Sequence, residues 1–160
     1  MPTRPMPVLA VVLLAVTALV GCSADDAATD EQAATLAQLQ HGTELIGDDL
    51  LAQVHGDLAR NQPEPASRAV SAAADSARYW SWSTRVRLTD YADRTPAQAA
   101  KALADHLIDQ GWQAGTVSRP ASGVTGLYRA DEDGAWEVDL AAPAQHTVEI
   151  KVLSPVTTGG

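Results

Sequence analysis

The sequence predicts an α+β fold: a two-layer sandwich in which a four-stranded, mainly antiparallel sheet is covered on one face by two helices. Two segments repeat their apolar residues with the 3.6-residue period of a helix, and four segments alternate apolar and polar residues as half-buried strands do. These segments follow one another in the order α, β, α, β, β, β. A chain of 160 residues is long enough to build one core from them.

The first helix is predicted to begin at a capping residue, Thr29 or Asp30, and to end before Pro63. One of its faces is apolar and is formed by Leu36, Leu39, Ile46, Leu50, Val54 and Leu58. Three glycines weaken this helix, and a kink or break can form near Gly47. The next residues, 66–78, are small and rich in alanine, and they fit either a short helix or a loop.

The first strand and the second helix have clearer signals. Residues 79–89 alternate between apolar and polar side chains, which is typical of a half-buried strand. Thr95 then caps a helix, Pro96 is its first residue, and Gln98 completes a capping box. Gly111 is the left-handed residue that is expected to end this helix.

Three further strands are predicted over residues 124–130, 135–141 and 147–153. Residues 131–134 end in Asp-Gly, which indicates a hairpin turn between the first two of these strands. The apolar faces of the strands are expected to lie under the helices. The opposite face of the sheet is then polar, with Arg85, Arg87, Glu137, Asp139, Glu149 and Lys151 on it.

Composition limits both the core and the partners. The chain contains four Trp but no Phe, so Leu, Val, Ile and Trp must fill the core. Its 20 acidic residues outnumber its 11 basic ones, which disfavours a nucleic-acid partner. The single cysteine excludes an internal disulfide and any zinc site built from several cysteines.

The N-terminus has the pattern of an export signal. Residues 8–20 are apolar except for Thr17, which is long enough for a signal-peptide core and too short to span a bilayer. Leu19-Val20-Gly21-Cys22 follows directly and resembles the lipobox of bacterial lipoproteins. The resemblance implies cleavage between Gly21 and Cys22, a diacylglyceryl group on the Cys22 thiol, and a location on the extracytoplasmic side of the cell membrane.

The resemblance and the composition together predict the organisation of the chain. It comprises a signal peptide (1–21), a lipidated cysteine with a polar tether (22–29), one α+β domain (30–155) and a frayed tail (156–160). The Ala-, Asp- and Arg-rich usage suggests an actinobacterial genome, and the layout resembles that of small actinobacterial envelope lipoproteins. The mature chain has 10 basic residues, because Arg4 is removed, against 20 acidic ones.

The chemical motifs of enzymes are missing from the sequence. No Gly-x-Ser-x-Gly, Ser-x-x-Lys or phosphate-binding loop is present, and Cys22 is committed to lipid, so we expect neither an enzyme nor a cofactor. His41, Glu44 and Asp48 would lie on one helical face, where they could chelate a metal ion. A solvated polar face explains the same pattern, and we predict no metal site.

The tryptophans leave two hypotheses for function. Trp80, Trp82, Trp112 and Trp136 could line a cleft between sheet and helices that holds a small apolar ligand. They could instead replace the missing phenylalanines as filler of the core, and this is the interpretation that we favour. The sequence therefore predicts a membrane-anchored lipoprotein with a non-enzymatic binding or protein-interaction domain, whose partner is an envelope protein or a small apolar ligand. The alternative is a carrier that holds an apolar ligand between sheet and helices.

Overall fold

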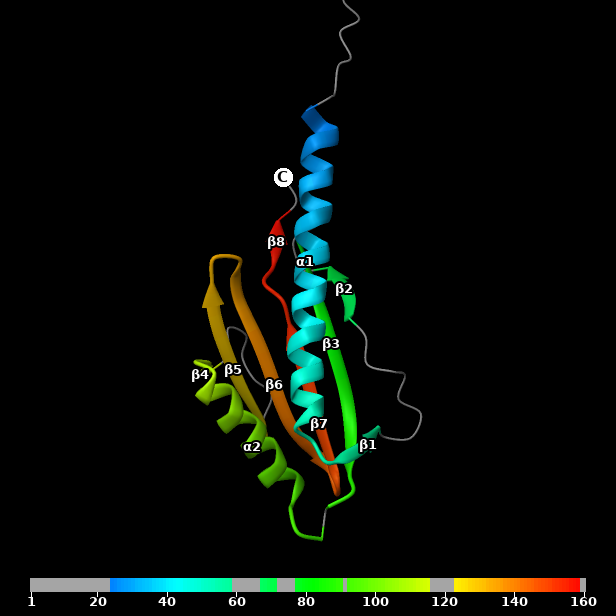
Figure 1. Ribbon diagram of the computed structural model, residues 1–160, viewed down its shortest axis with the longest axis vertical. Helices are drawn as coiled ribbons and strands as arrows, with labels where there is room; N and C mark the ends of the chain where they lie inside the picture. The colour runs from blue at the N-terminus through cyan, green and yellow to red at the C-terminus, as the bar shows by residue number, and fades with distance from the viewer. Residues whose placement is uncertain (1–23, 59–66, 72–76, 91, 116–122, 159–160) are drawn as a thin grey trace, which may run out of the picture.

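The computed structural model describes residues 24–58, 67–71, 77–90, 92–115 and 123–158 (Figure 1). The elements within these ranges are two helices, α1 (Ala24–Ala52) and α2 (Pro96–Asp109), and the strands β1 (Gly56–Leu58), β2 (Ser67–Ser71), β3 (Ala77–Leu88), β4 (Gln113–Ala114), β5 (Val124–Asp131), β6 (Gly134–Ala144), β7 (Thr147–Leu153) and β8 (Thr157–Thr158).

All the strands belong to one open, antiparallel sheet in the order β1-β3-β7-β6-β5-β4, with β2 and β8 also paired to β3. The predicted α+β class is confirmed, but the predicted number of four strands is wrong, because the described part of the sheet has eight. The four long strands are the predicted ones. The other four have two to five residues, which is too short to show an alternating pattern.

Two short strands form in segments for which no strand is predicted. Ser67–Ser71 form β2, within the segment for which a helix or a loop is predicted. Thr157–Thr158 form β8 and pair with Ala77 and Arg78, whereas a frayed tail is predicted there. In both cases the partner is the long strand β3, which has twelve residues and offers more backbone than β7 alone can pair with.

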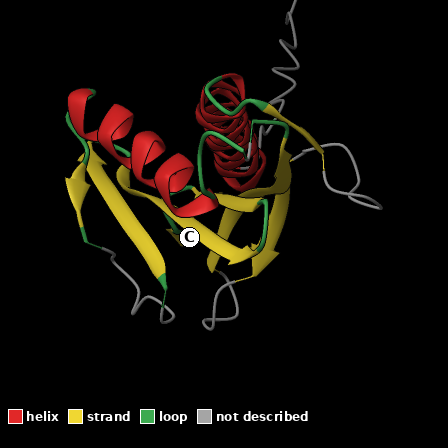
Figure 2. Cartoon of the chain, turned by 90° about the horizontal axis from the view of Figure 1, so that it is seen from below, coloured by secondary structure: helices red, strands yellow, loops and turns green. Residues whose placement is uncertain are grey.

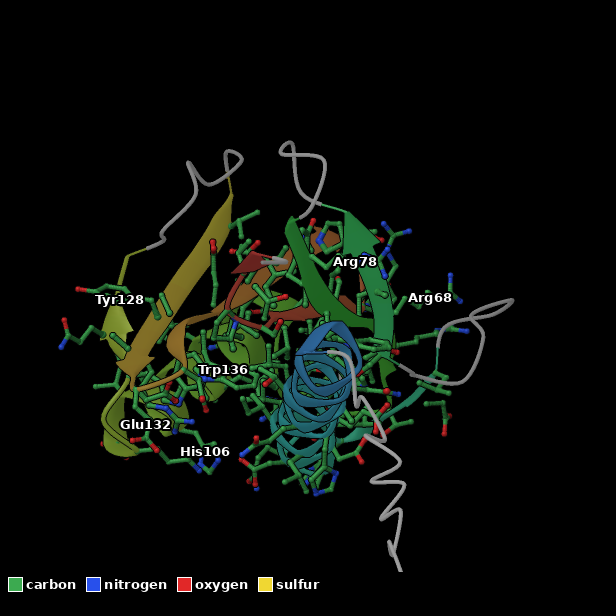
Figure 3. The ribbon with its side chains drawn as sticks, turned by 90° about the horizontal axis from the view of Figure 1, so that it is seen from above. Arg68, Arg78, His106, Tyr128, Glu132 and Trp136 are labelled. Atoms are coloured by element: carbon green, nitrogen blue, oxygen red, sulfur yellow. The ribbon has the colours of Figure 1, made fainter. Side chains whose placement is uncertain are left out.

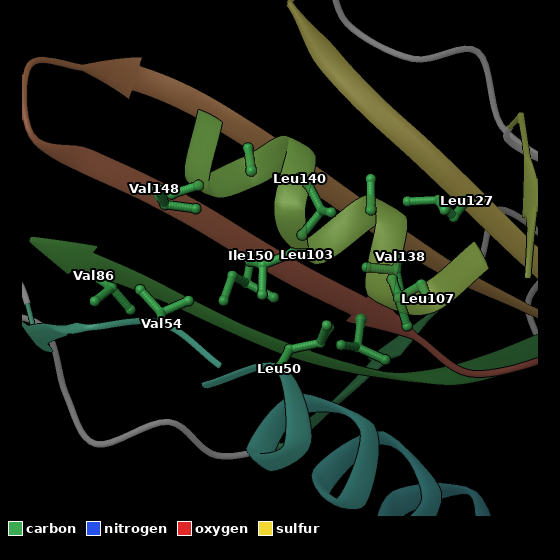
Figure 4. Packing of buried hydrophobic residues seen from close by; sticks show 14 of the residues in the cluster. Leu50, Val54, Val86, Leu103, Leu107, Leu127, Val138, Leu140, Val148 and Ile150 are labelled. Atoms are coloured by element: carbon green, nitrogen blue, oxygen red, sulfur yellow. The ribbon is translucent and has the colours of Figure 1, made fainter. Parts of the chain in front are cut away.

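Both helices lie on the same face of the sheet (Figure 2). Helix α1 packs on β3 and β7, and α2 packs on β5, β6 and β7. The core between these layers is made of aliphatic residues from every long element (Figure 4). Its most deeply buried members include Leu50, Val86, Leu107, Leu127, Val138, Leu140, Val148, Ile150 and Val152.

Two glycines of α1 let tryptophan rings of the sheet approach the helix backbone. A Cβ added at Gly42 would overlap the Trp136 ring, and one added at Gly47 would overlap the Trp82 ring. Trp82 is fully buried and Trp136 is 5% exposed. Helix α1 is continuous through both positions, so these glycines mark close packing, and no break occurs at Gly47.

The ends of α1 differ from the prediction. The helix begins at Ala24 instead of at a cap on Thr29 or Asp30, so residues 24–29 are helical where a tether is predicted. The alanines of this segment favour a helical backbone. The helix ends at Ala52, because Gly56 lies against the backbone of Arg87 and starts β1, a close approach that a helix continuing to residue 61 would prevent.

Helix α2 confirms its predicted signals. The Thr95 side chain accepts from the backbone N–H of Gln98, and the Gln98 side chain accepts from the backbone N–H of Thr95. Gly111 has a φ of 91°, and Trp112 donates its backbone N–H to the carbonyl of Leu107. This return of the chain buries Trp112 beneath the end of the helix.

Replacing Gly47 with Ala tests the packing of α1. In a helix interior this change alone stabilises by about 0.5–1 kcal/mol, because Ala has the higher helix propensity. We expect the opposite sign, a loss of about 1–3 kcal/mol, because the added methyl group overlaps the buried Trp82 ring. Urea denaturation measures the difference, with His41→Ala at an exposed position of the same helix as the control. A stabilised Gly47→Ala variant would show that α1 does not pack on Trp82.

Leu103→Ala tests the packing of α2. Leu103 is 2% exposed, so its truncation should leave a cavity and cost about 2–5 kcal/mol. Lys101 is exposed, and its ion pair within the described residues is with Asp105 on its own helix, so Lys101→Ala should change stability by less than about 0.5 kcal/mol. Denaturant melts of both variants make the comparison. Equal effects would contradict the placement of α2 over the sheet.

Candidate functional site

The four tryptophans all belong to the helix side of the sheet, but they fill space there. Trp82, Trp112 and Trp136 are buried, and Trp80 packs at the edge of the same cluster. The Arg129 guanidinium lies 4.9 Å from the centre of the Trp112 ring, a cation–π contact. Two surface hollows bounded by described residues have volumes of about 160 and 240 Å³, and no tryptophan lines either of them.

The indole N–H groups of Trp80, Trp82 and Trp136 have no acceptor within the described part of the chain. A buried donor without an acceptor costs stability. A tryptophan whose indole N–H has a structural role therefore normally donates it to an acceptor. These rings therefore contribute volume, as expected for a chain without phenylalanine. The packing of Trp82 and Trp136 against Gly47 and Gly42 leaves no room between them and the helix.

The polar stripe of α1 faces solvent. His41 and Asp48 are exposed, and Glu44 accepts a hydrogen bond from the Gln40 side chain at 3.1 Å. Among the residues that the structure describes, no group of three His, Cys, Asp or Glu side chains is placed to hold a metal ion.

One polar cluster joins the two helices. The Nε2 atom of His106 on α2 lies 2.9 Å from the Oδ2 atom of Asp49 on α1, and the Gln110 side chain donates to the same carboxylate oxygen at 3.3 Å. His106 and Asp49 are separated by 57 positions in the sequence, so no local motif could have revealed this pair. The cluster ties α1 to α2.

The helix-free face of the sheet contains the predicted polar residues. Arg85 lies opposite Glu149, and their side chains form an ion pair with 2.9 Å between Nε and Oε2. Lys151 lies between Ser83 on β3 and Asp139 on β6. The prediction of a polar face is correct in its residues, but exposure varies across it: Arg85 and Arg87 are exposed, whereas Glu137 is 5% exposed.

Asp139 is a half-buried acid of this face. Burial raises the pKa of its carboxyl above the ordinary value of 3.8, the neighbouring Glu137 carboxylate raises it further, and Lys151 partly offsets both. One carboxylate oxygen of Asp139 is buried without a hydrogen-bond partner within the described residues. Ionised Asp139 therefore destabilises the folded state.

The basic residues of this face belong mainly to two neighbouring strands. Arg68, Arg85 and Arg87 lie on this face in β2 and β3, which contain no acidic residue, whereas Arg78 of β3 shares the helix side with Trp80 and Trp82. Figure 3 shows Arg68 and Arg78 on the β2–β3 side of the molecule, far from Glu132 at the β5–β6 turn. In a chain with an excess of acids, this is a marked segregation of charge.

The lipobox residues, including Gly21 and Cys22, lie outside the described residues. No helix in the described ranges is both long enough and apolar enough to span a membrane. The chain has no significant match among protein-family models, curated proteins or solved structures.

Replacing Asp139 with Asn should stabilise the domain at neutral pH. The pKa of Asp139 is raised by folding, so its contribution to stability is fully present below its unfolded pKa and is lost as the pH rises through the folded pKa. We expect a higher Tm than wild type at pH 7 and a difference that disappears near pH 3. Asp48→Asn, which removes an exposed carboxylate from α1, is the control. A lower Tm at pH 7 for Asp139→Asn than for wild type would contradict this reading of the face.

Proposed function

We propose that the protein is a lipid-anchored envelope protein whose domain binds another protein and catalyses no reaction. The anchor is inferred from Leu19-Val20-Gly21-Cys22, which matches the lipobox pattern around the only cysteine of the chain. Two or three acyl chains on Cys22 would hold the domain at the extracytoplasmic surface of the cell membrane, since each buried CH₂ contributes about 0.8 kcal/mol.

The observation that favours protein binding over ligand transport is the filled core. A carrier needs a cavity of about 300–1,000 Å³ between sheet and helices. Here Trp82 and Trp136 occupy that position and touch the backbone of α1 at Gly47 and Gly42. The residues left for recognition are on the surface, and the helix-free face, with its row of arginines, is the best candidate.

The geometry of α1 suits an anchored domain. Figure 1 shows the N-terminal part of α1 extending past the end of the sheet. Leu39 is the first described side chain of α1 that is buried, and the preceding residues 24–38 correspond to about 22 Å of helix. With lipid on Cys22, this segment would act as a rigid spacer that holds the sheet away from the headgroups.

Cys22→Ser tests the anchor. The wild-type protein, purified from the membranes of its own host, should have Cys22 as its N-terminus and a mass increased by a diacylglyceryl group. The variant should lack the lipid and should remain uncleaved or leave the membrane fraction. Intact mass spectrometry distinguishes these forms. An unmodified Cys22 in the membrane fraction would refute the lipoprotein assignment.

Native mass spectrometry of the same wild-type preparation separates the two functional classes. We expect no co-purifying apolar molecule, because Trp82 and Trp136 pack directly against the backbone of α1. A ligand retained at one copy per chain, and lost from a variant of a buried tryptophan that still folds, would favour the carrier.

A further inference from the structure

We propose that the helix-free face of β2 and β3 binds an extended acidic segment of a partner protein. This inference rests on the proposed function and names the chemistry of the partner. Four arginines lie on these two strands without a single acidic residue. Three of them, Arg68, Arg85 and Arg87, belong to the face that the helices do not cover, and all three are exposed.

The placement of these arginines follows from the register of the sheet. Arg85 and Arg87 are two residues apart on β3, so their side chains leave the same face about 7 Å apart. Arg68 lies opposite Ser81, four residues before Arg85, which adds about 13 Å along the same direction. An extended peptide with acidic residues at alternate positions repeats its carboxylates at the same interval of about 7 Å.

The surface between the arginines suits a protein partner. Ser81 and Ser83 provide hydroxyl groups, and the half-buried side chains of Tyr79 and Val70 face each other across the β2–β3 pair. Arginine and tyrosine are the residues that most often dominate the binding energy of protein interfaces. The guanidinium group also accepts a carboxylate with two parallel hydrogen bonds, which a lysine cannot do.

Acidic side chains of the two neighbouring strands lie beside Arg85 and Arg87 but leave both arginines exposed. Asp57 on β1 lies opposite Arg87, and both of these side chains are exposed. Glu149 pairs with Arg85, but the Arg85 side chain is 51% exposed, and exposed pairs contribute only about 0–1 kcal/mol. A partner carboxylate can therefore replace Glu149 at little cost.

Helix α1 carries Glu44, Asp48 and Asp49 on the other side of the sheet, and the acids Glu137 and Asp139 of the helix-free face lie two strands away from β3, on β6. Both groups would repel an acidic partner and favour its binding at β2 and β3.

The test measures binding of a fluorescein-labelled peptide of alternating Glu and Ser to the lipidated full-length mature protein in neutral detergent, by fluorescence anisotropy. Wild type should bind, and the affinity should fall steeply between about 20 and 300 mM salt, as the Debye length shortens from about 20 to about 6 Å. The double variant Arg85→Glu, Arg87→Glu should bind at least about tenfold more weakly. Lys101→Glu, which reverses a charge on the exposed side of α2, should change the affinity less than about twofold.

Glu149→Gln keeps the proposal falsifiable if the charge reversals disturb folding. It releases Arg85 from its only ion pair in the described part of the chain, so it should tighten peptide binding about two- to fivefold, a gain that misfolding cannot produce. Unchanged or weaker binding of Glu149→Gln, or an equal loss for Lys101→Glu, would overturn the proposal.

Two further measurements test other occupants of the face. Arginine-dependent binding to phosphatidylglycerol vesicles without peptide binding would identify a membrane as the occupant. Arginine-dependent self-association in sedimentation velocity would identify a second copy of the chain. Either result overturns the acidic-partner proposal but leaves the lipid anchor intact, whereas an unlipidated Cys22 or a retained apolar ligand argues against the proposed function itself.

Discussion

The contact of Trp82 and Trp136 with the backbone of α1 is the constraint on which the rest of the structure depends. The chain has no phenylalanine, so its largest apolar side chains are indoles, and two of these lie directly against the backbone of α1. Gly42 and Gly47 remove the Cβ atoms that would collide with the rings, so α1 can lie close on β3 and β7. The loss of helix propensity at each glycine is offset by the burial of one large ring.

The elements of the fold differ in how far they could be predicted from the sequence. Helix α2 could be predicted from end to end, because Thr95, Pro96, Gln98 and Gly111 act locally on the backbone. The role of the glycines in α1 could not be predicted. A glycine that only weakens a helix and a glycine that allows an aromatic ring to pack on the helix backbone look the same in a sequence. The short strands could not be predicted, because β2 and β8 exist only where the long strand β3 offers backbone to pair with.

The residues of the helix-free face could be predicted from the sequence, but their burial and ionisation could not. Strand alternation alone placed Arg85, Asp139 and Lys151 on the helix-free face. The burial of Glu137 and the raised pKa of Asp139 depend on how the chain packs there, which no local pattern encodes. The tryptophans show the converse: their common face was predictable, whereas the packing of Trp82 and Trp136 against the backbone of α1 depends on the tertiary structure.

The direction of α1 relates the proposed anchor to the proposed binding face. Figure 1 shows α1 running along the same direction as the long strand β3, with its N-terminal end beyond the edge of the sheet. Lipid at Cys22 would place the membrane beyond that end. The long strands of the sheet would then run roughly perpendicular to the bilayer surface. The arginine face of β2 and β3 would then look sideways, along the membrane plane and not toward the headgroups. In this orientation the face would be accessible to other envelope proteins, and residues 24–38 would keep its arginines more than a Debye length from anionic lipid at physiological salt.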